Sequence, residues 1–165
     1  MTIAFYITAA IAILATLLVI TGRHAVHALL YLVVSLFAVA VLFYLMGAPF
    51  AAALEVIVYA GAIMVLFVFV IMMLNVGRDA LMVEGGWKNI GGWLGPALLC
   101  LVLLVQWLWI LGQGSDAGIA GNRVPAAAVG GALFGPYLLA VEMAGLILLV
   151  ALVGAFRLGG KEEKA

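Results

Sequence analysis

A glutamate and a tyrosine stand four residues apart inside an otherwise apolar run. Glu55 is the only charged residue between positions 51 and 74, and Tyr59 carries the only hydroxyl group there. Helix residues four apart share one face, so the two polar groups would lie side by side. A carboxyl group at membrane depth indicates a functional site by default, and apolar surroundings disfavour its charged form. We therefore predict that Glu55 is a proton-path residue, with Tyr59 as its hydrogen-bond partner or as the gate of a water path.

Both residues also have a structural interpretation. Glu55 lies near the start of its run, where a helix dipole favours negative charge. Tyr59 could be a packing aromatic with a locally satisfied hydroxyl group. The adjacent small residues Ala60, Gly61 and Ala62 would let another helix approach closely, or would lower the cost of a change in helix geometry.

Glu142 is a second carboxylate within an apolar run and a second proton-path candidate. No lysine or arginine lies inside any of the expected spans. Glu142 and Glu55 are therefore either protonated, or their partners belong to another chain.

The composition places the chain in a membrane. Of its 165 residues, 69% are hydrophobic and 8% are charged, and the mean hydropathy is +1.39. A soluble domain has about 25% charged residues. The formal net charge of zero gives no reason to expect a nucleic-acid partner, whereas lipid is an expected neighbour.

No motif for a metal, a cofactor or covalent catalysis is present. Cys100 is the only cysteine, and His24 and His27 have no evident third ligand. Phosphate loops, haem and iron–sulfur motifs, nucleotide fingerprints and catalytic triads are all missing from the sequence. We therefore expect no catalytic residue, no bound metal and no bound cofactor in this chain.

Five apolar runs are long enough to span a bilayer, which takes about 20 helical residues. Runs of this length favour helices over barrel strands, so the sequence predicts an all-α integral membrane protein with one membrane domain over residues 1–165. We expect the first run to be a span and not a signal peptide, because no basic residue precedes it. The expected spans are 3–20, 26–46, 51–74, 93–111 and 136–156.

The basic residues orient these spans. Six of the seven fall on the side that holds the first and third loops and the C-terminus, and only Arg123 falls on the other side. The positive-inside rule then predicts an N-terminus outside (periplasmic) and a cytoplasmic C-terminus. The six are Arg23, Arg78, Lys88, Arg157, Lys161 and Lys164.

The prolines mark the expected boundaries. We place Pro49 in the short second turn, and Pro96 and Pro136 in the first turns of the fourth and fifth spans, where a missing N–H costs little. Residues 112–135 form the longest outer loop and hold no chemical motif. The sequence shows no inverted repeat of the kind that builds many transporters.

Three stretches resemble one family closely. They are HALLY at 27–31, ALEVIVYAGAIMVLFVFVIMMLN at 53–75 and LFGPYLLAVE at 133–142. They are similar to subunit J of bacterial respiratory complex I, the counterpart of mitochondrially encoded subunit 6. The resemblance runs from the first span through the fifth and is most specific in the third.

The resemblance implies a subunit of proton-pumping NADH:quinone oxidoreductase in the bacterial inner membrane, without a redox cofactor of its own. NADH, FMN, iron–sulfur clusters and quinone would belong to the whole complex. The implied partners are the quinone-chamber subunit, small three-helix subunits and antiporter-like subunits. In the family, the third helix can carry a π-bulge whose conversion to α geometry is thought to open or close a water path. The matching gate or helix-switch candidates are Tyr59, Ala60, Gly61, Ala62, Ile63, Met64, Val65 and Leu66.

Other functions stay open beside this energy-coupling role. The chain could be a purely structural subunit of the same complex. It could also be a stand-alone transporter, or a subunit of a related antiporter or membrane-bound hydrogenase.

Overall fold

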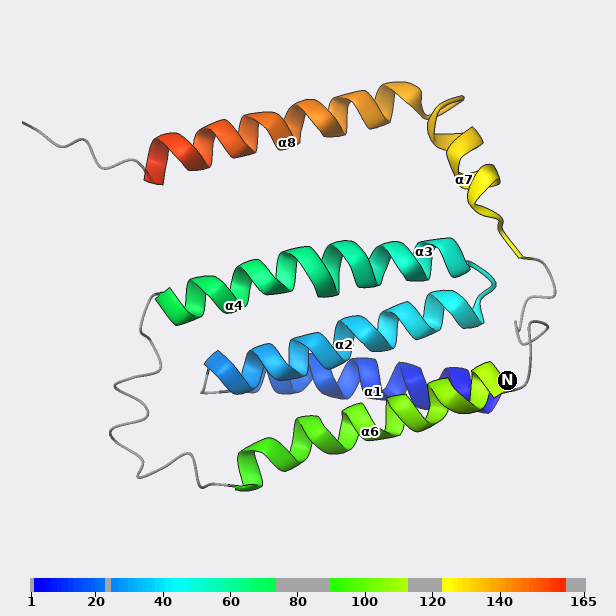
Figure 1. The fold of residues 1–165 in the computed structure, drawn as a ribbon, viewed down its shortest axis with the longest axis vertical. Helices are drawn as coiled ribbons and strands as arrows, with labels where there is room; N and C mark the ends of the chain where they lie inside the picture. The colour runs from blue at the N-terminus through cyan, green and yellow to red at the C-terminus, as the bar shows by residue number, and fades with distance from the viewer. Residues whose placement is uncertain (1, 23–24, 74–89, 113–122, 160–165) are drawn as a thin grey trace, which may run out of the picture. The chain divides into compact units, whose positions relative to one another are not determined.

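All regular elements in the described part of the chain are helices. The computed structural model describes residues 2–22, 25–73, 90–112 and 123–159. Five of its helices are long and apolar enough to cross a membrane (Figure 1). The predicted all-α architecture with five spans is confirmed, whereas the sidedness of the termini stays a prediction. The five are Thr2–Thr21, Ala25–Leu45, Pro49–Met73, Trp93–Gly112 and Leu138–Gly159.

The chain divides into two units, Met1–Val124 and Pro125–Ala165. Whether they form the single membrane domain expected from the sequence stays a prediction. The first unit holds four of the five spans. Its elements are α1 (Thr2–Thr21), α2 (Ala25–Leu45), α3 (Pro49–Leu54), the π-helix η1 (Glu55–Ile63), α4 (Met64–Met73) and α6 (Ile90–Gly112).

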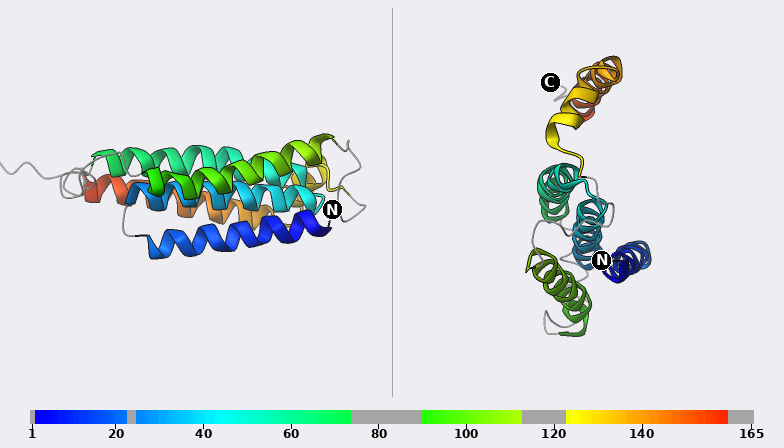
Figure 2. Two further views of the ribbon diagram at one scale, coloured as in Figure 1. Left: turned by 90° about the horizontal axis from the view of Figure 1, so that it is seen from below. Right: turned by 90° about the vertical axis from the view of Figure 1, so that its right-hand side faces the viewer.

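Helix α2 is the centre of the first unit. It packs against α1, against α6 and against all three segments of the third span, α3, η1 and α4. The end-on view in Figure 2 shows α2 between these neighbours. Because α2 touches every other span of this unit, it sets the position of the third span.

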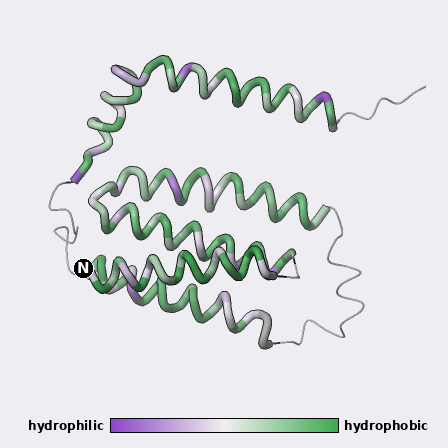
Figure 3. The backbone as a smooth tube through the Cα atoms, turned by 180° about the vertical axis from the view of Figure 1, so that it is seen from behind, coloured by the Kyte–Doolittle hydropathy of each residue, from purple (hydrophilic) through white to green (hydrophobic). Residues whose placement is uncertain are grey.

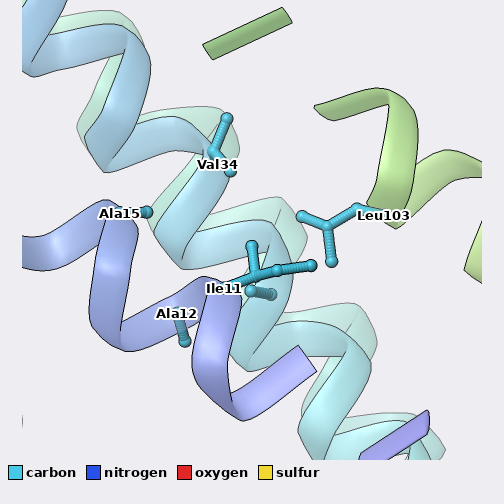
Figure 4. Packing of buried hydrophobic residues seen from close by; sticks show 6 residues of the cluster. Ile11, Ala12, Ala15, Val34 and Leu103 are labelled. Atoms are coloured by element: carbon cyan, nitrogen blue, oxygen red, sulfur yellow. The ribbon is translucent and has the colours of Figure 1, made fainter. Parts of the chain in front are cut away.

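Small side chains let α1 and α2 approach closely. Ala15 and Ala38 are fully buried in a cluster that α6 completes with Leu103 (Figure 4). A second cluster joins the three helices nearer the other end of the bundle, around Leu45 and Ile110. Close backbone approach through small residues is the usual basis of helix packing in lipid, where apolar burial gives little driving force between helices.

Hydrogen bonds from side chains add specificity to this packing. The Gln106 amide nitrogen on α6 donates to the hydroxyl oxygen of Thr8 and to the carbonyl oxygen of Ala4 on α1, each at 2.6 Å. The hydroxyl groups of Thr16 and Ser35 lie 2.8 Å apart and link α1 to α2. The two polar contacts fix the register of α1 against its two neighbours.

A tight turn joins α2 to the third span. Gly47 adopts a left-handed conformation with a φ of 85°, which glycine reaches without a steric penalty. The N–H of Ala48 donates to the carbonyl oxygen of Phe43 at 3.0 Å. The N–H of Val124 donates to the carbonyl oxygen of Gly47 at 2.9 Å. Pro49 then occupies the first helical position, so it starts the third span instead of lying in the turn before it.

The second unit contains α7 (Ala126–Leu133) and α8 (Leu138–Gly159). Two hydrogen bonds close the turn between them. The N–H of Tyr137 donates to the carbonyl oxygen of Ala132, and the N–H of Leu138 donates to the carbonyl oxygen of Gly135. Helix α8 is apolar over most of its length (Figure 3), and no residue of either helix is buried. An apolar helix without buried residues has its packing partners elsewhere or faces lipid.

Besides Pro49, three sequence-based placements were wrong. The segment predicted as a loop over 112–135 contains α7, because three alanines follow Pro125 and favour a helix; residues 113–122 lie outside the described part. Pro96 lies in the interior of α6, since this helix begins at Ile90, ahead of the apolar run. Pro136 lies in the turn before α8 and not in its first helical turn.

The Thr8–Gln106 contact predicts a measurable stability effect. Thr8→Val removes a fully buried hydroxyl group that accepts from the partly buried Gln106 amide, so the free energy of unfolding should fall by about 1 kcal/mol. Titration of the purified chain from mild detergent into SDS measures this change. Thr21→Val is the matched control, because the Thr21 hydroxyl bonds only to the Leu17 carbonyl of its own helix. Equal effects of the two substitutions would contradict an interhelical role.

Candidate functional site

The third span changes helix type twice, from α to π at Glu55 and back to α at Met64. At the end of α3, the N–H of Glu55 donates to the carbonyl oxygens of Ala51 and Ala52, as in an ordinary helical turn. At the end of η1, the N–H of Met64 reaches the carbonyl oxygens of Gly61 and Tyr59, and the second of these lies five residues back. Nine residues, Glu55–Ile63, adopt this wider π geometry. Such segments are rare and are frequently found at functional sites.

The local sequence suits a helix of relaxed geometry. Residues 56–58 are Val, Ile and Val, whose branched side chains crowd the preceding turn of an α-helix. Gly61 follows, and a Cβ atom built on it would lie 3.2 Å from the carbonyl oxygen of Val56, five residues earlier. That spacing is tighter than almost all real Cβ contacts. Glycine therefore avoids a crowded contact with the Val56 carbonyl oxygen at this position of the π segment.

Glu55 and Tyr59 both belong to η1. Glu55 is its first residue and is partly buried, and Tyr59 is 49% exposed. Within the described residues, no side chain or backbone group hydrogen-bonds the Glu55 carboxylate or the Tyr59 hydroxyl group. The direct Glu55–Tyr59 hydrogen bond that their spacing allowed is not formed. Both groups are thus available to water or to another chain.

An apolar cavity of about 720 Å³ lies between α2, the third span and α6. The third span contributes Val56 and Ile57 to its wall, among others, whereas Glu55 and Tyr59 do not line it. The π-helix thus presents aliphatic side chains to its own bundle. Its two polar side chains do not line this cavity, which favours partners outside this unit.

The gate candidates fall into two groups. Tyr59–Ile63 lie in the π-helix, whereas Met64, Val65 and Leu66 begin the following α-helix α4. Met64 is only 2% exposed, while Val65 and Leu66 are exposed. The π-helix also begins four residues before the predicted segment and includes Val56, Ile57 and Val58. The run of branched residues was the one sequence signal that could have indicated this earlier start.

Glu142 belongs to the second unit. It is the fifth residue of α8 and is exposed. The structure therefore places the two carboxylates in different units, and their roles in proton transfer stay predictions.

Known proteins are similar to this chain over nearly its whole length. Residues 15–158 match the family model of NADH-ubiquinone/plastoquinone oxidoreductase chain 6. The chain is 56% identical to NADH-quinone oxidoreductase subunit J of Pseudomonas aeruginosa, over 99% of each chain. It is 54% identical to the protein of that name from Escherichia coli, over 100% of this chain and 89% of the relative. A relative of the same name from Buchnera aphidicola is 46% identical over 97% of this chain and 98% of its own.

The family model covers the second, third and fourth spans completely, the fifth except for its last residue, and the last third of the first. The relatives cover all five spans. A match of this extent leaves no separate region of the chain to be explained by another family. This chain belongs to the NADH-ubiquinone/plastoquinone oxidoreductase chain 6 family.

Proposed function

We propose that this chain is a membrane subunit of NADH-quinone oxidoreductase that helps couple quinone reduction to proton translocation. Its family membership supports the first part of the proposal. The observation that carries the second part is the nine-residue π-helix that begins at a membrane-depth carboxylate. NADH, FMN, the iron–sulfur clusters and quinone then belong to other subunits, and this chain contributes protein conformation and proton-carrying groups.

The coupling step is a change of η1 between π and α geometry. When one turn converts from five-residue to four-residue hydrogen bonds, the helix that follows must rotate about its axis. That rotation carries the exposed residues at the start of α4, Val65 and Leu66, around the helix. When the rotation of α4 moves these bulky aliphatic side chains, they open or close a water path beside Tyr59.

The polar face of η1 supplies the proton-handling groups. Glu55 passes a proton between water and a group on a neighbouring subunit, and Tyr59 governs access to it. Both side chains lie off the chain's own apolar cavity, in agreement with a path at a subunit boundary. Glu142 is the second proton-path candidate, on a separate unit of the chain.

The setting of the subunit completes the proposal. It lies in the bacterial cytoplasmic membrane with its N-terminus outside and its C-terminus inside. Its neighbours are the quinone-chamber subunit, the small three-helix subunits and the antiporter-like subunits. The excess of basic residues on one side of the five spans supports this orientation.

Purification through a C-terminal tag in mild detergent tests the assignment. The proposal predicts that a large assembly with NADH:quinone activity copurifies with the tagged chain. Hydrogenase or antiporter partners without NADH oxidation would keep the coupling idea but change the enzyme. A chain that purifies alone, or only with copies of itself, would contradict the proposal and favour a stand-alone transporter.

Glu55→Gln tests the proton-carrying role. The substitution keeps the size of the side chain and removes the titratable group, so protons translocated per NADH oxidised should fall by about tenfold or more. The amount of assembled complex should stay close to that of the wild type. Proton uptake by membrane vesicles, normalised to complex abundance, measures the effect, and Glu55→Asp should retain part of the pumping. A purely structural role predicts unchanged pumping per assembled complex in both variants.

Gly61→Ala tests the helix switch. The new methyl group would crowd the Val56 carbonyl oxygen in π geometry. Alanine also stabilises an α-helix by about 1 kcal/mol relative to glycine, so the substitution should shift the segment toward α geometry. Solid-state NMR on the complex in bilayers can follow the Met64 amide nitrogen as its coupling moves from the Tyr59 carbonyl carbon to that of Ala60. Gly154→Ala on α8 is the control, because its added Cβ meets nothing within 4 Å. An unchanged Tyr59–Met64 coupling in Gly61→Ala would refute the proposed bias.

A further inference from the structure

Helix α8 carries a carboxylate that has no lysine or arginine within reach in the five described spans. The only lysine or arginine in the five spans is Arg157, at the opposite end of the same helix. At 1.5 Å per residue it lies roughly 22 Å along the axis from Glu142, beyond the reach of both side chains. His27, a further basic side chain within a span, belongs to α2 and packs edge-on against Trp93.

The surroundings of Glu142 are otherwise apolar. Glu142 is exposed, and no group in the described residues hydrogen-bonds it. Leu146 and Leu149 follow it at helical spacing on the same face, and both are more than half exposed. A carboxyl group in hydrocarbon needs either a proton together with a hydrogen-bond partner or a positive charge beside it. Both requirements call for a polar group from outside α8.

The helix leaves room for such a group. Gly145 lies three residues after Glu142, on the adjoining part of the same face, and a Cβ atom built on it would meet nothing within 4 Å. A long side chain could lie across this glycine, with its apolar stem against Leu146 and its charged end at the carboxylate. Lysine and arginine have this shape, whereas a lipid acyl chain carries no positive charge to pair with Glu142.

We propose that α8 docks through its Glu142 face onto a membrane helix of another subunit, which presents a lysine or arginine at the depth of Glu142. The proposal rests on the proposed function in that the partner is part of the same membrane assembly. It gives Glu142 a role in docking, through charge pairing, whether or not protons also pass through it. Charge complementarity selects this partner over acyl chains and over a second copy of this chain, since the described spans of this chain hold no lysine or arginine at that depth.

Photo-crosslinking in the purified assembly tests the proposal. Leu149, on the Glu142 face, is replaced by a benzophenone amino acid, and Ile147, on the opposite face of α8 and 64% exposed, receives the same group as a control. The Leu149 probe should capture one membrane helix of another subunit, with a lysine or arginine within about one turn of the level of Glu142. The Ile147 probe should not capture that helix. Capture of residues 1–124 of this chain, of lipid alone, or of a helix without a basic residue would overturn the proposal.

Substitutions of Glu142 test whether charge pairing holds the docked helices together. Glu142→Gln should lower the yield of the Leu149 crosslink by about tenfold or more, and Glu142→Asp should retain most of it. Glu142→Lys should abolish the crosslink, and reversing the charge of the captured basic residue should restore it. An undiminished yield in Glu142→Gln would overturn the ionic basis of docking.

The same preparation separates this inference from the proposed function. If NADH:quinone activity copurifies but the Leu149 probe captures a helix without a basic residue, only the docking inference fails. If the probe captures a basic helix in an assembly that does not oxidise NADH, the proposed function fails and the docking face stands.

Discussion

The need to satisfy every backbone N–H and C=O group within a span constrains the whole molecule. The third span meets it in two ways, with ordinary turns in α3 and α4 and with five-residue turns in η1. Since both arrangements satisfy the same backbone groups, neither is excluded by hydrogen bonding. Packing therefore decides between them, and a modest change at a neighbouring subunit can shift the balance.

The first unit supplies a rigid frame for that balance. Alanine contacts and the Thr16–Ser35 hydrogen bond hold α1 against α2, and Gln106 fixes α6 to α1. Beside this frame the π-helix has no buried residue, whereas Met64, directly after it, is almost completely buried. The π-helix itself thus has no fully buried side chain to oppose a change in its geometry, whereas rotation of α4 has to move the buried Met64 within its packing.

Much of this organisation could be predicted from the sequence, because apolar runs near 20 residues specify spans directly and an isolated carboxylate such as Glu55 is conspicuous within them. The extent of the π-helix could not be predicted, because packing against neighbours that are distant in sequence decides between π and α geometry. Gln106 and Thr8, which hold the frame together, are 98 residues apart. Helix α7 was missed because its eight residues are too few for a span, and its glycines and alanines also suit a loop. Residues 74–89 and 113–122 lie outside the described part of the chain.

Electron cryo-microscopy of the purified assembly, frozen at rest and during turnover with NADH and quinone, tests the central claim most directly. The account predicts that Glu55–Ile63 is a π-helix in one population of molecules and an α-helix in another, with the proportions changed by turnover and the start of α4 rotated between them. A π-helix of unchanged geometry in every population under both conditions would contradict a switch in the third span and leave this subunit with a structural role.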